Sequence, residues 1–294
     1  ALPHPNRDRA RTTLPLMPDS ATSPSVSTSV EGDVTVIRID DGKANALTFE
    51  VIDAVSAALD RAAEESKAVV LLGRDGKFSA GFDLSVMTGP DTAEMLRLLG
   101  SGAELGLQVY LSPIPVVLGV TGHALAMGAI LTTCADHRVG ADGPFKIGLN
   151  EVAIGMPVPG FAIGMCRDRL RKTWFQRCLQ LAYICSPTEA VEAGFLDEVV
   201  ASDAVAERAL EVAKGLAAYV HPGPFRATRT GMRGETAEQL RAGLARDLGA
   251  FDVTPARPLP TRPPLAPPPP SCSVLRAAPD LGPLAEQNGE LGAR

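Results

Sequence analysis

The 294-residue sequence predicts an α/β fold with a helical C-terminal portion. Three observations support this prediction. Short apolar runs, typical of strands buried between layers, occur through the first half of the chain. These runs lead through turns into stretches with helical periodicity, so strands and helices alternate. From about residue 160 onward, helical patterns dominate and one short strand pattern remains.

The first half can be divided into elements in chain order. Residues 34–39 alternate apolar and polar side chains and end at an Asp-Asp-Gly turn, which predicts a strand. Thr48 is a suitable N-cap, and apolar residues recur at helical spacing from Val51 to Ala62. The next predictions are a strand at 68–72, a segment of small residues at 78–83 and a helix over 91–111. Three glycines at 100, 102 and 106 weaken the helical signal of that stretch.

The remaining elements follow the same reasoning. A strand is expected at 116–120, a turn at 122–126, a helix over 127–135, and strands at 137–140 and 145–147. Helices are then predicted over 160–170, 172–182, 187–193, 204–219 and 235–250, with a last strand at 196–200.

The two ends differ in composition from the rest. Residues 1–30 are rich in Pro, Ser and Thr and have no apolar period, which predicts a disordered leader. Residues 253–294 form a predicted disordered tail, with nine prolines between Pro255 and Pro270. A proline-rich run can bind a partner, but it is more often only a tail. One domain is therefore expected over residues 31–252, and its last part, about 200–252, is helical.

Composition excludes several classes of protein. The formal net charge of −6 leaves no basic stripe for nucleic acid, and no apolar run approaches membrane-spanning length. Five cysteines without a C-x-x-C pair favour reduced thiols, and the histidines lack ligand spacing, so we expect neither a metal nor another cofactor. Without an apolar secretory segment, the expected location is cytoplasmic.

Two segments of small residues each follow a buried strand, at 79–82 and 121–128. Small residues allow a ligand to approach the backbone, and the second segment ends where a helix begins. Together they could direct two N–H groups at one oxygen and stabilise an enolate or tetrahedral oxyanion. Either segment alone is more often a tight turn.

Glu151 is flanked by the apolar residues Val152, Ala153 and Ile154. Burial without a partner would raise the pKa of its carboxyl, which suits a base that transfers protons. On this stretch alone, a solvent-exposed glutamate is the more common alternative.

Several motifs in register resemble the crotonase superfamily of enoyl-CoA hydratases and isomerases. They cover about residues 31–252 and are specific at the level of the superfamily. The motifs are Lys43-Ala-Asn-Ala-Leu47, Phe78-Ser-Ala-Gly-Phe-Asp83, the Gly122–Gly128 segment, Cys134-Ala-Asp-His-Arg138, Ile147-Gly-Leu-Asn-Glu151 and the stretch from Ser186 to Val199.

The resemblance implies a spiral of ββα units, a homotrimer or homohexamer, and acyl-CoA thioester substrates, with no cofactor beyond the substrate's own CoA. It implies that the amides of Phe82 and Met127 bind the thioester oxygen. It also implies a set of positions that contact the substrate. These are Lys43, Ala44, Asn45, Ala46, Leu47, Ala80, Gly81, Asp83, Leu84, Gly128 and Ile130.

Glu151 matches the second of two glutamates with which the family's hydratases hold water, and Ile130 occupies the position of the first. One glutamate suffices to move a proton between carbons, so the pattern resembles the family's Δ3,Δ2-enoyl-CoA isomerases. A hydratase remains an alternative if Glu94, Glu104 or Asp83 supplies the missing carboxylate. A non-catalytic acyl-CoA-binding protein is a second alternative. We also expect the Met127 side chain to narrow or reshape the acyl pocket.

Overall fold

The computed structural model describes residues 25–249, and the first element lies where a leader was predicted. Strand β1 (Val26–Glu31) pairs antiparallel with β2 (Val34–Ile39), so the predicted domain boundary at residue 31 is wrong. Only Val26 of β1 is buried, which explains why an edge strand with five exposed residues carried no apolar signal. The rest of the predicted leader and the tail at 253–294 lie outside the described residues.

The main sheet has six strands in the order β1-β2-β4-β7-β9-β11, and all pairs beyond β2 are parallel. The strands after β2 are β4 (Ala68–Leu72), β7 (Val116–Val120), β9 (His137–Ala141) and β11 (Glu198–Val200). Alternate residues of β4 pack on opposite faces: one set joins α8 (Val205–Tyr219), and the other joins the larger core. The sheet is therefore covered on both faces, as continuous apolar runs predict.

A second, smaller layer of strands positions the residues of the candidate site. Strands β5 (Gly76–Ser79), β8 (Gly122–Leu125) and β10 (Ile147–Gly148) form a three-stranded sheet, and β3 (Ala46–Leu47) pairs with β6 (Gly81–Phe82). The turn predicted at 122–126 is wrong, because most of it is β8. Each of β4, β7 and β9 is followed by a strand of the second sheet and then by a helix. This repetition confirms the spiral of ββα units.

The helices occur largely where periodicity predicts them, with one exception in the C-terminal portion. Helix α9 begins at Pro222 rather than at residue 235. Its first turns contain glycines and prolines that disguise the helical pattern. The other helices are α1 (Phe49–Glu65), α2 (Leu84–Met87), α3 (Thr92–Leu111), α4 (Met127–Cys134), α5 (Gly160–Arg169), α6 (Lys172–Leu179) and α7 (Pro187–Ala193), with 3₁₀ turns η1 (Val152–Ile154) and η2 (Ser202–Ala204).

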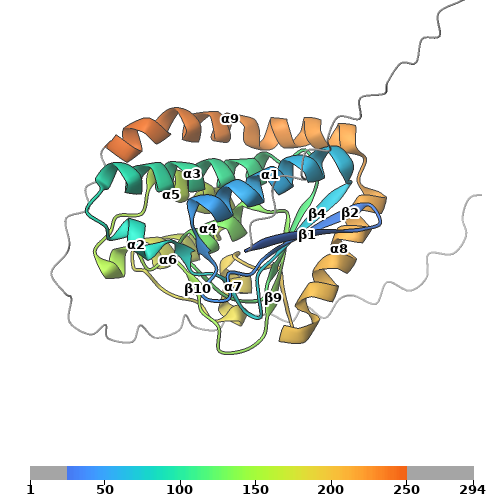
Figure 1. The fold of residues 1–294 in the computed structure, drawn as a ribbon, viewed down its shortest axis with the longest axis horizontal. Helices are drawn as coiled ribbons and strands as arrows, with labels where there is room; N and C mark the ends of the chain where they lie inside the picture. Colours follow the sequence, from blue (N-terminus) through green and yellow to red (C-terminus); the bar gives the residue numbers. More distant parts are fainter. Residues whose placement is uncertain (1–24, 250–294) are drawn as a thin grey trace, which may run out of the picture. The chain divides into compact units, whose positions relative to one another are not determined.

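Helix α9 lies along α3 and also packs on α5 (Figure 1). Arg229 holds it in place: the guanidinium is 6% exposed and donates at 2.7 Å to both carboxylate oxygens of Asp136. Arg233 donates to the carbonyls of Tyr110 and Cys134. The C-terminal helix therefore supports the two helices that form the rear of the site. Within residues 25–249, no helix combines the length and apolarity needed to cross a bilayer.

Candidate active site

A cavity of about 240 Å³ lies where the second sheet meets α2, α3, α4 and α5. Five of the fourteen residues that sequence reasoning assigned to the site line it, namely Glu151, Phe82, Ala80, Leu84 and Ile130. The other lining residues are Met87, Leu99, Leu125, Ala126, Asn150, Ile154, Met156, Pro159 and Phe161. The walls are thus apolar apart from one carboxylate and one amide.

Glu151 is placed by the turn that follows β10. Gly148 allows this turn because its φ of 148° is unfavourable for other residues. The Glu151 side chain is only 8% exposed, and its Oε2 atom has no hydrogen-bond partner among the described residues. Burial raises the pKa of the carboxyl to about 7, although the backbone amides of Glu151 and Asn150 act in the opposite direction. The residue is therefore suited to accept and return a proton near neutral pH.

The two segments of small residues meet beside this carboxylate. A Cβ added at Gly81 would lie 2.7 Å from Ala126 Cβ and 3.3 Å from the Met127 amide nitrogen. A Cβ at Gly128 would lie 2.6 Å from the Ser79 carbonyl oxygen. Glycine at positions 81 and 128 thus allows the start of α4 to pack closely against β6 and against the end of β5.

Ala126 turns the chain from β8 into α4 with φ 50° and ψ −124°, a conformation that favours glycine. Its own amide donates to the Gly148 carbonyl, which links this turn to the loop that carries Glu151. Met127 is the first residue of α4, so the helix offers its N–H no acceptor. The amide nitrogen lies beside Gly81 of β6.

Helix α3 runs without a break from Thr92 to Leu111, so the predicted helix is confirmed despite its three glycines. The glycines instead allow close packing: a Cβ at Gly102 would overlap the ring of Phe82, and one at Gly106 would lie 3.4 Å from Met127 Cε. Met127 is fully buried against this glycine face and does not line the cavity. Its side chain therefore does not narrow the cavity directly, and a reshaping of the pocket through its neighbours stays a prediction.

The Lys43–Leu47 motif is divided between exposed and structural positions. Lys43 is exposed, and Ala44 and Ala46 are partly exposed. Asn45 and Leu47 are fully buried, so their predicted contact with CoA is wrong in this structure. The Asn45 amide donates to the carbonyls of Ile39, Lys77 and Phe78, and its φ is 52°. Its role is to hold together the turn that precedes β3.

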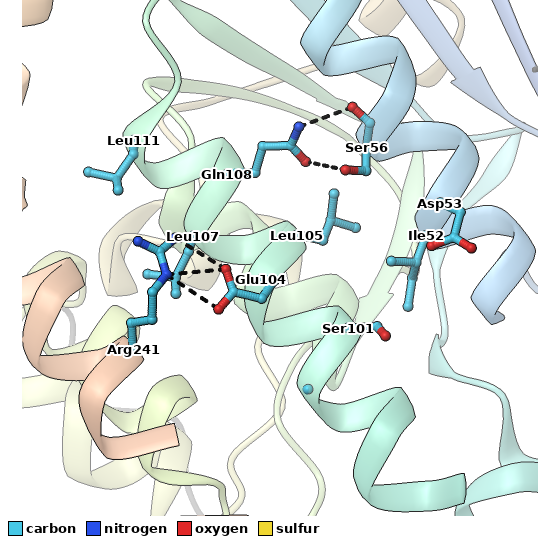
Figure 2. A pocket seen from close by; sticks show the side chains of 11 residues that line it. Ile52, Asp53, Ser56, Ser101, Glu104, Leu105, Leu107, Gln108, Leu111 and Arg241 are labelled. Atoms are coloured by element: carbon cyan, nitrogen blue, oxygen red, sulfur yellow. Dashed lines mark hydrogen bonds and ion pairs between the residues drawn. The ribbon is translucent and has the colours of Figure 1, made fainter. Parts of the chain in front are cut away.

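The carboxylates considered as a second catalytic group lie elsewhere. Glu104 lines a separate hollow of about 550 Å³ between α1, α3 and α9, where Arg241 binds it at 3.1 Å (Figure 2). Glu94 lines a neighbouring hollow of about 610 Å³. Asp83 caps α2 by accepting hydrogen bonds from the amide and hydroxyl of Ser85. In the described part of the chain, Glu151 is the one carboxylate that lines the cavity.

Sequence reasoning missed the apolar residues that close the cavity, such as Leu99 on α3 and Phe161 on α5. Their spacing within a helix is the same as that of ordinary core residues, so periodicity does not distinguish a cavity wall from a packed interior. The glycines of α3 are the signal that could have located this region, because close approach to a helix requires small residues.

Comparison with known proteins agrees with this geometry. The family model described as enoyl-CoA hydratase/isomerase matches residues 29–257. Mouse mitochondrial enoyl-CoA delta isomerase 1 is 33% identical over 231 residues, covering 77% of this chain and 79% of that protein.

Solved structures of proteins named as enoyl-CoA isomerases and hydratases also resemble this chain. An apo enoyl-CoA isomerase from Mycobacterium tuberculosis is 36% identical, with a TM-score of 0.73, covering 77% of this chain and 99% of its own. An enoyl-CoA hydratase from Mycobacterium ulcerans has the same identity and TM-score, covering 77% of this chain and 98% of its own. The family model, the sequence relatives and the fold agree, and this chain belongs to the enoyl-CoA hydratase/isomerase family.

Proposed function

We propose that the chain converts 3-enoyl-CoA to 2-trans-enoyl-CoA, with Glu151 as the group that carries the proton. The observation that supports this proposal best is a single buried carboxylate in a cavity whose other described walls are apolar apart from the Asn150 amide. Ile130 lines the same cavity at the position where the family's hydratases have their other glutamate. An apolar side chain there cannot hold a water molecule for attack.

The proposed reaction has two proton transfers. Ionised Glu151 removes a proton from C2, and the electron pair of that C–H bond moves toward the thioester oxygen to give a dienolate. Protonated Glu151 then donates the same proton to C4, and the double bond forms between C2 and C3. The carboxyl ends in its starting state, and no electrons are gained or lost. The chemistry therefore needs no cofactor beyond the CoA of the substrate.

The backbone amides of Phe82 and Met127 are proposed to bind the oxygen on which negative charge develops. Support comes from the contact of Gly81 with Ala126 and Met127, which brings the two amide-bearing segments together. A donor that is fixed before the reaction is worth about 2.7–4 kcal/mol to an oxyanion transition state. Phe82 is held by the glycine face of α3, so it does not have to reorganise.

Hydration is disfavoured because it requires an oriented water as well as proton transfer. None of Glu94, Glu104 and Asp83 lines the cavity, and residues 25–249 supply no second carboxylate there to complete a hydratase. Loss of positioning alone costs several kcal/mol in a reaction of this kind. The names of relatives include both activities, and two of those described above are isomerases.

The test is to supply 3-hexenoyl-CoA and crotonyl-CoA to the same preparation. We expect absorbance of the conjugated 2-enoyl thioester to increase with the first substrate, and little hydration of the second. Glu151→Gln should abolish isomerisation and also the incorporation of solvent deuterium at C2. Fast crotonyl-CoA hydration without isomerisation would make the protein a hydratase. Tight CoA-ester binding without deuterium exchange would make it a binding protein.

The assembly and location remain predictions. A homotrimer or homohexamer is expected from the family resemblance, and size-exclusion chromatography with light scattering measures it directly. The predicted cytoplasmic location also stays open to test, because the mouse relative is named as mitochondrial. Neither property enters the proposed chemistry.

A further inference from the structure

We infer that the Glu151 cavity selects apolar acyl chains of short to medium length, up to about ten carbons, and discriminates against long chains. This inference rests on the proposed function, since it assumes that the acyl group enters this cavity. It follows from which walls of the cavity are exposed, what supports the buried walls, and how much volume they enclose.

The cavity has an open rim and a closed rear. Leu84 on α2 and Ile154 on η1 line it with 70% and 53% of their surfaces exposed, so they form the mouth. Leu99, Ile130 and Phe161 line it with exposures of 2%, 1% and 1%. An acyl chain that enters past the rim therefore ends against buried side chains.

The rear wall has little room to retreat. Leu99 lies on α3 and Phe161 on α5, and both helices pack on α9. Gly164 of α5 contacts Leu240 so closely that even a Cβ would overlap it. Widening the cavity at this end would require α5 to separate from α9, which Arg229 anchors to the core. Close-packed interiors of this kind resist such displacement.

The enclosed volume sets the length. A cavity of about 150 Å³ is known to hold one benzene molecule, which corresponds to about 25 Å³ per carbon. By that measure the 240 Å³ cavity holds about nine or ten carbons. A chain of sixteen carbons would need about 400 Å³, so its last carbons would have to remain outside or force the walls apart.

The lining also favours chains without a polar end. Among the described residues, no Lys, Arg or His lines the cavity, so a carboxylate at the far end of the acyl chain would be buried there without a cation. Burial of an unpaired charge is strongly unfavourable. An acyl group with a terminal carboxylate should therefore be a poor substrate compared with an alkyl chain of the same length.

The first experiment measures kcat/KM for 3-enoyl-CoA substrates of six, eight, ten, twelve and sixteen carbons. Each buried methylene should raise kcat/KM about fourfold until the cavity is full. We expect a maximum at eight to ten carbons and at least a tenfold lower value at sixteen. A value at sixteen carbons that equals or exceeds the maximum would overturn the inference.

The second experiment changes the rear wall of the cavity by mutation. Leu99→Ala should shift the optimum by about two carbons toward longer chains, because it deepens the rear of the cavity. Leu105→Ala is the matched control: it lies on the same helix, is also 2% exposed, and lines the other hollow (Figure 2). The control should leave the optimum unchanged. An unchanged optimum in Leu99→Ala, or an equal shift in both variants, would overturn the inference. Phe161→Leu provides a milder change of the same wall if Leu99→Ala does not fold.

A third measurement separates this inference from the proposed function. Saturated acyl-CoA thioesters of four to sixteen carbons cannot isomerise, but calorimetry can measure their Kd. An affinity maximum at eight to ten carbons without isomerase activity would support the cavity inference and reject the proposed function. Isomerase activity with no dependence on chain length in either measurement would reject the cavity inference and leave the proposed function intact.

Discussion

Replacing Glu151 with Gln should change the free energy of unfolding more favourably at pH 8 than at pH 5. The same substitution should remove the proposed activity. The reason is the burial of the carboxyl, which raises its pKa from 4.5 to about 7. In the unfolded chain the same group titrates near 4.5. Between these two values the folded state holds a proton that the unfolded state has released. Stability is therefore lost as pH rises through this window.

The magnitude follows from the two pKa values. At pH 5 the folded state is destabilised by about 0.8 kcal/mol, since the unfolded group is already mostly ionised. At pH 8 the cost reaches about 3.3 kcal/mol, because ionisation of the buried group is then almost complete. The difference of about 2.5 kcal/mol is absent in Glu151→Gln. Any pH-independent cost of placing the Gln amide where Oε2 has no partner is the same at both pH values and cancels.

The assay is urea unfolding of both proteins at pH 5 and pH 8, followed by circular dichroism. The stability of Glu151→Gln relative to wild type should increase by about 2.5 kcal/mol between the two conditions, or roughly 5–10 °C in Tm. Glu64→Gln is the control, because Glu64 is exposed on α1 and the substitution relieves no burial. A change below about 1 kcal/mol, or an equal change in the control, would refute the reasoning from burial.

Three further predictions follow from the same structure. The kcat/KM for isomerisation should rise with pH to a plateau with an apparent pKa near 7, because the free enzyme must hold the buried carboxyl ionised; a profile flat from pH 5 to 9 would contradict this. Gly102→Ala should lower kcat/KM at least tenfold, because the added Cβ would displace Phe82. Gly100→Ala is the control and should not lower it, because its Cβ would lie 3.5 Å from the nearest neighbour. Equal losses in the two variants would contradict this prediction. Asp136→Ala should lower the free energy of unfolding by about 3–5 kcal/mol, since Arg229 would be left buried without its carboxylate, and urea unfolding measures it.

The fold could be predicted from sequence where one period dominates. The buried strands β4 and β7 and helix α1, with Thr48 as its N-cap, occur where apolar spacing predicts them. Strand β1 could not be found this way, because an edge strand is stabilised by its hydrogen-bond ladder and little of it is buried. The start of α9 was also missed, since its stability comes from the tertiary bond between Arg229 and Asp136 rather than from helix propensity.

The site could be predicted only in part for a related reason. The apolar neighbours of Glu151 make it a candidate, but exposure is the more common outcome for such a stretch, and the family resemblance is what predicts its role; the structure does bury it. The Lys43–Leu47 motif predicts contact with the ligand, but the side chain of Asn45 makes internal hydrogen bonds instead. A sequence motif indicates that a residue matters, but it does not indicate whether the side chain contacts the ligand or the protein backbone. Only the burial of Asn45 separates those two explanations.

The hydrogen bonds of Asn45 and Ala126 explain how the site tolerates a buried charge and strained backbone conformations. Ionised Glu151 costs about 3 kcal/mol at neutral to alkaline pH, a large fraction of the 5–15 kcal/mol by which most domains are stable. Asn45 and Ala126 add backbone conformations with positive φ. Such strain persists where the surroundings determine the conformation more strongly than the residue itself does. Asn45 meets that condition through its three carbonyl acceptors, and Ala126 through its bond to Gly148 in the loop before Glu151. The strained turns are thus the connections that hold the two amide-bearing segments and the buried carboxylate in fixed relation.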